Sequence, residues 1–199
     1  MMSYFGRFNY NYMSKYLLEM NLRYDGSSKF RPENRWDFFY GFSGGWRLSE
    51  EEFMKNVKFV NELKLRLSYG VVGNQSGISR YDGMQLYNFN SVNGAYIGDG
   101  RISYIKTSGE IATMGRSWER IHNYNLGLDF HLFDSRLQGT VELFMKKNNN
   151  MLIAVAYPGI LGDKAPASNS GKFEAKGYEG TVTWSDKIGK VNYHVGGTF

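Results

Sequence analysis

Cysteine is absent from this 199-residue chain, so a disulfide framework and thiolate-bound metal sites are excluded. Proline is scarce, with three residues, and no apolar stretch approaches the roughly 20 residues that a membrane-spanning helix needs. The formal net charge is +5, but the lysines and arginines are scattered and form no basic run. Because a basic run or patch marks a nucleic-acid interface, we expect no nucleic-acid partner.

Apolar and polar residues alternate with a period of two. Between residues 16 and 24 the odd and even positions form two sets, one with Leu18, Met20 and Leu22 and the other with Glu19 and Arg23. Successive side chains of a strand point to opposite faces, so this pattern predicts a strand with one apolar and one polar face. An aromatic content of 17% and 24 glycines also suit long strands joined by tight turns.

The alternation predicts eight strands in all. They cover residues 4–12, 16–24, 36–48, 62–72, 118–133, 137–147, 173–184 and 191–199. Most are longer than the usual five or six residues and match the 9–11 residues that cross a bilayer at a tilt. Tyrosine and tryptophan gather near the strand ends, where a bilayer has its headgroups: Tyr12, Tyr16, Tyr24, Trp36, Trp46, Tyr69, Trp118 and Trp184.

This combination favours an all-β fold, a portion of an antiparallel up-and-down transmembrane β-barrel. A soluble β-sandwich is the alternative, since its strands also alternate, with the apolar face buried against a second sheet. In the barrel the apolar set would face lipid: Tyr16, Leu18, Met20, Leu22, Trp36, Phe38, Tyr40, Leu63, Leu65, Leu67, Leu126, Leu128 and Phe130.

Short and long connections alternate along the chain. Short turns are expected at 13–15, 134–136 and 185–190, and long polar stretches at 25–35, 73–117 and 148–172. Outer-membrane barrels place short turns at the periplasmic end and long loops outside. Residues 49–59 form a longer periplasmic connection, in which Ser49 and Glu52 resemble a capping box and predict a short helix. Within 73–117, residues 84–89 and 96–106 form either a hairpin or coil.

Candidate binding residues are few. Loop aromatics could stack on sugar rings, although packing within the loops explains them as well: Tyr81, Tyr87, Phe89, Tyr96, Tyr104 and Tyr157. Charges on the polar faces could contact a solute, although cross-strand pairing in a hydrated interior explains them as well: Glu19, Arg23, Glu62, Lys64 and Arg66.

Catalytic and metal-binding patterns do not stand out. The three histidines, His122, His131 and His194, lie on different strands without the spacing of a metal site. No nucleophile elbow or phosphate loop is present. We therefore expect no catalytic residues, no metal, no cofactor and no enzymatic activity.

Several short sequence segments resemble those of one known family. They are LRYDGSSKF at 22–30, NRW at 34–36, GGWRLSEE at 44–51, FMK at 53–55, LKLRLSYGVVGNQ at 63–75, WE at 118–119, NLGLDF at 125–130 and LQG at 137–139. Their order and spacing resemble the barrel of SusC/RagA-type TonB-linked outer-membrane transporters of Bacteroidetes.

That resemblance implies a 22-stranded barrel with an N-terminal plug and a TonB box. It also implies a SusD-like lipoprotein partner and import of oligosaccharides or peptides, driven through TonB. Residues 1–199 would supply about eight to ten strands of such a barrel, without the plug domain, and would contact outer-membrane lipid, the rest of the barrel and the plug. Residues 1–7 lack the features of a signal peptide, so we expect the start of the protein to lie upstream.

Two other functions fit the pattern less closely. Eight strands can close around a filled interior, so a self-contained small outer-membrane barrel with a structural or adhesive role is one alternative. A soluble β-rich enzyme, such as a glycan hydrolase, is the other.

Overall fold

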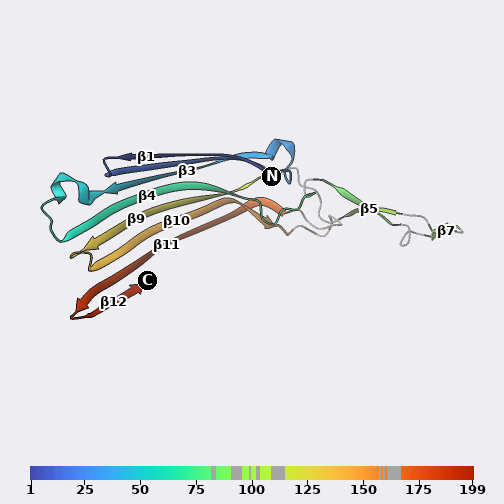
Figure 1. Ribbon diagram of the computed structural model, residues 1–199. Helices are drawn as coiled ribbons and strands as arrows, with labels where there is room; N and C mark the ends of the chain where they lie inside the picture. Colours follow the sequence, from blue (N-terminus) through green and yellow to red (C-terminus); the bar gives the residue numbers. More distant parts are fainter. Residues whose placement is uncertain are drawn as a thin grey trace.

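The chain forms one curved layer of antiparallel strands in the computed structural model (Figure 1). The structure describes residues 1–81, 84–90, 96–98, 100–101, 104–108, 115–156, 158, 160 and 167–199, and for 88–90, 96–97, 101 and 104–108 it describes the backbone. No helix in this described part is long and apolar enough to cross a membrane.

Eight strands make the main sheet, in the order β1-β2-β3-β4-β9-β10-β11-β12. They are β1 (Met2–Tyr12), β2 (Tyr16–Gly26), β3 (Trp36–Arg47), β4 (Val60–Asn74), β9 (Glu119–Leu132), β10 (Leu137–Ala154), β11 (Ala167–Ile188) and β12 (Val191–Thr198). Each strand pairs antiparallel with the next along the sheet, which is the up-and-down topology that the alternation predicted. The eight predicted strands are therefore confirmed.

β10 and β11 exceed their predicted lengths the most. β10 has 18 residues and β11 has 22, so both run on into the stretch expected as a loop. Their pairing continues to Ala154 opposite Ala167 through two irregularities in register. Those irregularities disturb the two-residue period, which is why the sequence pattern ended too early.

A smaller ladder lies between β4 and β9. β5 (Leu86–Asn90) pairs with β8 (Tyr104–Ser108), and β6 (Tyr96–Ile97) pairs with β7 (Gly100–Arg101). Of the two predictions for this region, the structure shows the hairpin, which lies beyond the end of the main sheet (Figure 1).

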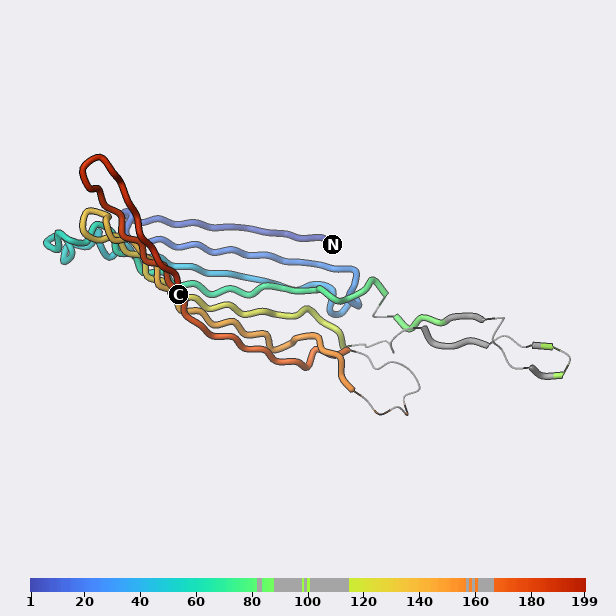
Figure 2. Tube along the Cα trace, turned by 90° about the horizontal axis from the view of Figure 1, so that it is seen from below, coloured from blue at the N-terminus to red at the C-terminus, as the bar shows by residue number. Residues whose placement is uncertain are grey.

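Short turns and long connections lie at opposite ends of the sheet. Figure 2 shows the 49–59 connection and the turns after β9 and β11 together at one end, with residues 26–36 and 74–81 at the other. The β1–β2 turn is closed by the Lys15 amide, which donates to the Tyr12 carbonyl at 3.0 Å. Its two central residues, Met13 and Ser14, have positive φ (52° and 55°), the geometry that matches strand twist.

The predicted helix in 49–59 is confirmed as a short one, but its predicted cause is wrong. Two 3-10 turns form, η2 (Leu48–Glu50) and η3 (Glu52–Met54). Neither begins with a side-chain cap, and the Ser49 hydroxyl is buried without a hydrogen-bond partner in the described structure. Ser49 lies inside η2 rather than before it, so it cannot act as a capping residue.

Among the residues that the structure describes, no second layer covers the apolar face of the sheet. Register aligns Leu67 with Leu126, and Leu126 with Leu143, on one face. Leu67 is 62% exposed and Leu143 52%. The buried hydrophobic side chains of the described residues form one small cluster where the long connections leave the sheet: Phe30, Phe39, Val71, Ile78 and Trp118. A sandwich would bury the apolar face instead.

Candidate functional site

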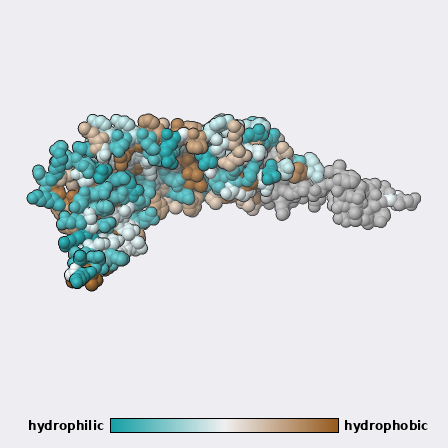
Figure 3. Space-filling view, viewed as in Figure 1, coloured by the Kyte–Doolittle hydropathy of each residue, from teal (hydrophilic) through white to brown (hydrophobic). Residues whose placement is uncertain are grey.

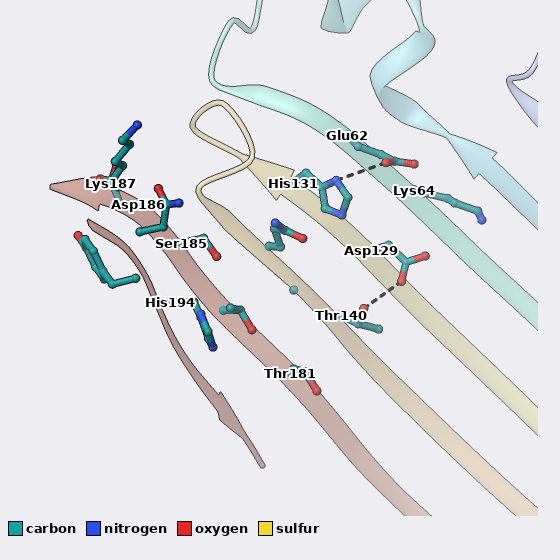
Figure 4. A pocket seen from close by; sticks show the side chains of 15 residues that line it. Glu62, Lys64, Asp129, His131, Thr140, Thr181, Ser185, Asp186, Lys187 and His194 are labelled. Carbon is teal, nitrogen blue, oxygen red and sulfur yellow. Dashed lines mark hydrogen bonds and ion pairs between the residues drawn. The ribbon is translucent and has the colours of Figure 1, made fainter. Parts of the chain in front are cut away.

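The polar face of the sheet is hollowed at the short-turn end. Side chains from β4, β9, β10, β11 and β12 line an open hollow of about 860 Å³. Its lining includes Lys64, Asp129, Thr181 and His194 (Figure 4). In the space-filling view, hydrophilic residues predominate over this end of the sheet (Figure 3). The polar face is therefore the inner side of the curve, and the apolar face is the outer side.

Arg66 of β4 binds two carboxylates at the centre of the inner face. Its Nε lies 2.8 Å from Asp129 Oδ2 and its Nη2 lies 2.9 Å from Asp129 Oδ1, a bidentate pair across to β9. The same Nη2 bonds Glu142 of β10, which also accepts a hydrogen bond from the Asn125 amide at 3.0 Å. One guanidinium thus links three adjacent strands through charge-assisted bonds.

A glycine makes room for this guanidinium. Gly127 lies opposite Arg66 in the ladder between β4 and β9. A Cβ placed on Gly127 would lie 3.0 Å from Arg66 Nη2 and 3.1 Å from its Cζ. The absence of a side chain therefore lets the guanidinium lie flat over β9.

His131 and His194 line the same hollow, although they are 63 positions apart in the sequence (Figure 4). The His131 Nδ1 atom lies 3.5 Å from Glu62 Oε2 on β4. No group of three histidine, aspartate or glutamate side chains in the described residues could hold a metal ion. The hollow offers paired charges and hydroxyl groups to a polar solute.

Glu51 fastens the 48–59 connection to the outer face of the sheet. Its carboxylate accepts hydrogen bonds from the Tyr16 hydroxyl at 2.7 Å and from Trp46 Nε1 at 3.0 Å, and it lies 3.3 Å from Lys15 Nζ. Hydrogen bonds from Tyr16 and Trp46, with the Lys15 charge, hold the pKa of Glu51 below its usual range. Glu51 lies beyond the strand predicted at 36–48, and no pattern in the sequence indicates this role.

A buried carboxylate joins the strands at the opposite end of the sheet. Glu119 at the start of β9 is 7% exposed. It accepts hydrogen bonds from the Asn74 amide at 2.8 Å and from the Leu152 backbone amide at 2.6 Å, and Asn148 Nδ2 lies 3.5 Å away. Glu119 therefore joins the ends of β4, β9 and β10. Trp118-Glu119 is one of the segments that resemble the known family, but the sequence alone indicates no role for Glu119.

Asparagines complete this end of the sheet. The Asn169 amide donates to the Ser117 carbonyl at 3.1 Å and to the Asn150 carbonyl at 3.0 Å, and Asn34 donates to the Arg116 carbonyl at 3.0 Å. These bonds tie the connections that follow β2 and precede β9 to each other and to the ends of β10 and β11. Asparagine at 148–150, where alternation stops, is the sequence signal that could have indicated them.

Tyr81 and Tyr87, the two predicted loop aromatics whose side chains the structure describes, do not line the inner hollow. Tyr81 is 58% exposed and Tyr87 of β5 is 64% exposed. Phe89, Tyr96 and Tyr104 lie in β5, β6 and β8, where the backbone is described, and Tyr157 lies outside the described residues. Contact of these residues with a solute remains a prediction.

The residues predicted to face lipid share the outer face. Register aligns Tyr16 with Trp46 and Tyr24 with Phe38 on that face. Aromatic rings mark both of its ends: Tyr12, Tyr16 and Trp46 follow one another at centroid distances of 6.4 Å near the short turns, and Trp36 stacks on Tyr24 at 4.9 Å at the other end. Lipid contact itself remains a prediction.

Comparison with known proteins places these features in one family. The family model described as "TonB dependent receptor-like, beta-barrel" matches residues 2–199. The chain is 34% identical over 185 residues to the TonB-dependent receptor SusC of Bacteroides thetaiotaomicron, covering 92% of this chain and 18% of SusC. It is 35% identical over 187 residues to the TonB-dependent receptor P39 of Formosa agariphila, covering 90% of this chain and 17% of P39.

Solved structures of similar fold belong to the same kind of protein. The RagAB peptide importer in its "open-open" state superposes with a TM-score of 0.81 at 27% identity, covering 98% of this chain and 21% of that chain. The chain thus spans about a fifth of the length of the relatives that it matches.

Proposed function

Because the chain belongs to the TonB-dependent receptor-like β-barrel family, we propose that it forms part of the wall of a transporter that imports nutrients across the outer membrane. The observation that carries this proposal is a single-layer sheet with an exposed apolar outer face and a charged, concave inner face. Backbone groups in lipid must pair within a closed sheet or a helix, and such a two-faced sheet is the wall that a barrel requires.

Each part of the segment has a place in this proposal. The outer face contacts lipid, the inner face lines a hydrated lumen, and the Arg66–Asp129–Glu142 cluster keeps three strands in register beside it. The 1–199 segment is a partial barrel domain, and the plug that gates passage lies in another part of the protein. A SusD-like lipoprotein and TonB are the expected partners, by likeness to the SusC receptor and the RagAB importer.

Oligosaccharides or peptides are the proposed solutes. One structural relative is named a peptide importer, and the loop aromatics Tyr81 and Tyr87 are exposed at the long-connection end. Aromatic rings with wet surroundings can stack on sugar rings or pack on apolar peptide side chains. The relatives carry the names of receptors and importers, and we propose no catalytic role and no cofactor for this chain.

The two alternatives have less support. In the described sheet β1 and β12 lie at opposite edges, so the eight strands do not close on themselves as a small barrel would. An enzyme with a soluble β-fold would cover the outer face with a second layer, and the described residues place none there.

Uptake in cells tests the proposal. A strain that lacks the full-length protein would be complemented with the wild-type gene and offered fluorescent oligosaccharides and, separately, fluorescent peptides. We expect accumulation of one class, and we expect an uncoupler of the inner-membrane proton gradient to abolish it. Accumulation that persists with the uncoupler would indicate a passive pore and contradict a TonB-driven role.

Loop variants refine the test. We expect Tyr87→Ala combined with Tyr96→Ala to weaken solute binding, whereas Tyr178→Ala on the outer face of β11 should leave binding unchanged. Tyr178 is 69% exposed and makes no contribution to the inner hollow. Equal binding by all three proteins would remove the loop aromatics from the solute site.

A further inference from the structure

A group of lysines interrupts the apolar outer face on β10 and β11. Lys147 lies opposite Glu174, and Lys176 lies opposite Met145, in the ladder between these strands. Met145 itself lies opposite Tyr124, which belongs to the outer set. Because alternate residues of a strand share a face, Lys172, Glu174 and Lys176 all lie on the outer face with Lys147.

The group carries excess positive charge. Lys147 Nζ lies 3.4 Å from Glu174 Oε2, and Lys176 Nζ lies 2.6 Å from Glu174 Oε1. One carboxylate therefore holds two ammonium groups close together, and Lys172 on the same strand is exposed. Three lysines against one glutamate leave a local charge of about +2, which suits a phosphate group.

The position of these lysines along the strands matches the edge of the apolar band. On β2 the outer-face aromatics Tyr16 and Tyr24 are eight residues apart, and on β11 Trp184 and Lys176 have the same separation. Eight residues extend about 27 Å along a strand and span about 20 Å across a bilayer at a tilt near 40°. Trp184 lies at the short-turn end, where its ring centroid is 6.5 Å from that of Phe133. Lys176 therefore lies at the level of the opposite headgroup zone.

We propose that Lys147, Lys172 and Lys176 bind the phosphate of an anionic lipid in the leaflet at the long-connection end. The lysines point away from the inner hollow, so a solute in the lumen cannot reach them. Their aliphatic stems can lie along the apolar face while the ammonium groups reach the headgroups. The site does not depend on the identity of the transported solute.

Lipid retention by the full-length protein tests this site. The purified protein would be mixed with detergent micelles that contain bis-phosphorylated lipid A or, separately, its dephosphorylated form, and native mass spectrometry would count bound lipids. Each lysine near an anionic surface strengthens binding about fivefold. We therefore expect the Lys147→Gln, Lys172→Gln, Lys176→Gln triple variant to retain phosphorylated lipid at least about fivefold less than wild type.

A matched variant controls for charge. Lys55→Gln, Lys58→Gln, Lys190→Gln removes three exposed lysines from the short-turn end, and we expect it to retain lipid as wild type does. Heat-modified migration on a gel would show that each variant is folded. Equal retention by the two triple variants, or equal binding of the dephosphorylated lipid, would each overturn the proposal.

Discussion

The two faces of the same strands differ in what they contact, and β9 illustrates the difference. Its outer residues, Leu126, Leu128 and Phe130, lie opposite apolar partners on β4. Its inner residues Asn125 and Asp129 belong to the Arg66 and Glu142 cluster. The same strand thus has apolar neighbours on one face and a charged cluster on the other. Alternation along the strands therefore identifies the two faces, whereas the curvature of the sheet shows which face is inside.

The largest expected effect comes from a charge on the wrong face. Leu128→Arg places a guanidinium midway along the outer face and should destabilise the barrel in lipid by about 2–4 kcal/mol. Asn125→Arg, on the inner face of the same strand, should cost much less because its neighbour Glu142 can accept the new donor. Urea unfolding in lipid vesicles measures both. Equal costs would contradict the assignment of the two faces.

The inner cluster gives the next effect. Arg66→Met leaves Asp129 and Glu142 without their shared cation and should destabilise the protein by about 1–2 kcal/mol, since the three groups are partly exposed. Adding Asp129→Asn to this variant should cost little more, because the partner is already gone. A double-mutant cycle measures the coupling. Additive losses would mean that the bidentate pair contributes nothing.

Glu51 is a carboxylate that is bound to side chains of the apolar outer face, and its effect on stability depends on pH. Its pKa is lowered in the folded protein, so its contribution to stability is present above the ordinary carboxyl range near 4.5 and is lost as the pH falls through the folded value. Glu51→Gln should therefore lower the melting temperature at pH 7 and make less difference at pH 3. A gap between the two proteins that stays constant over this range would count against the pKa shift.

The smallest effect is expected at the turn between β1 and β2. Met13 and Ser14 adopt positive φ without glycine. Replacing them by Asn and Gly, the preferred pair for this turn, should stabilise the protein by about 0.5–1 kcal/mol. Tyr193→Gly, beside the existing Asn192 in an extended part of β12, creates the same Asn-Gly pair and should not stabilise the protein. Equal gains at both places would mean that the backbone of the turn is not strained.

Much of the fold follows from the period of two. All eight strands and the alternation of short and long connections could be predicted, because a half-exposed strand repeats its pattern at every second residue. The ends of β10 and β11 could not, since irregular register and the polar run at 148–150 hide the period. The 3-10 turns at 48–54 formed where a helix was expected, but Glu51 rather than Ser49 holds them.

The site was predicted less completely. The sequence identified Arg66 and Glu62 as inner charges, yet it could not pair Arg66 with Glu142, which is 76 positions away. Glu119 is buried through contacts with Asn74 and Leu152, and no local pattern indicates such distant partners. The hollow that His131 and His194 share likewise depends on the order β9-β10-β11-β12 in the sheet, which no local pattern gives.

The free side of β1 has a consequence for how such a wall is assembled. β1 is an 11-residue strand with β2 as its only neighbour in the described sheet. In hydrocarbon each amide or carbonyl left without a partner costs several kcal/mol. Within a bilayer, a wall of this kind is therefore stable only when the outward side of β1 also pairs with a strand, as a closed barrel provides.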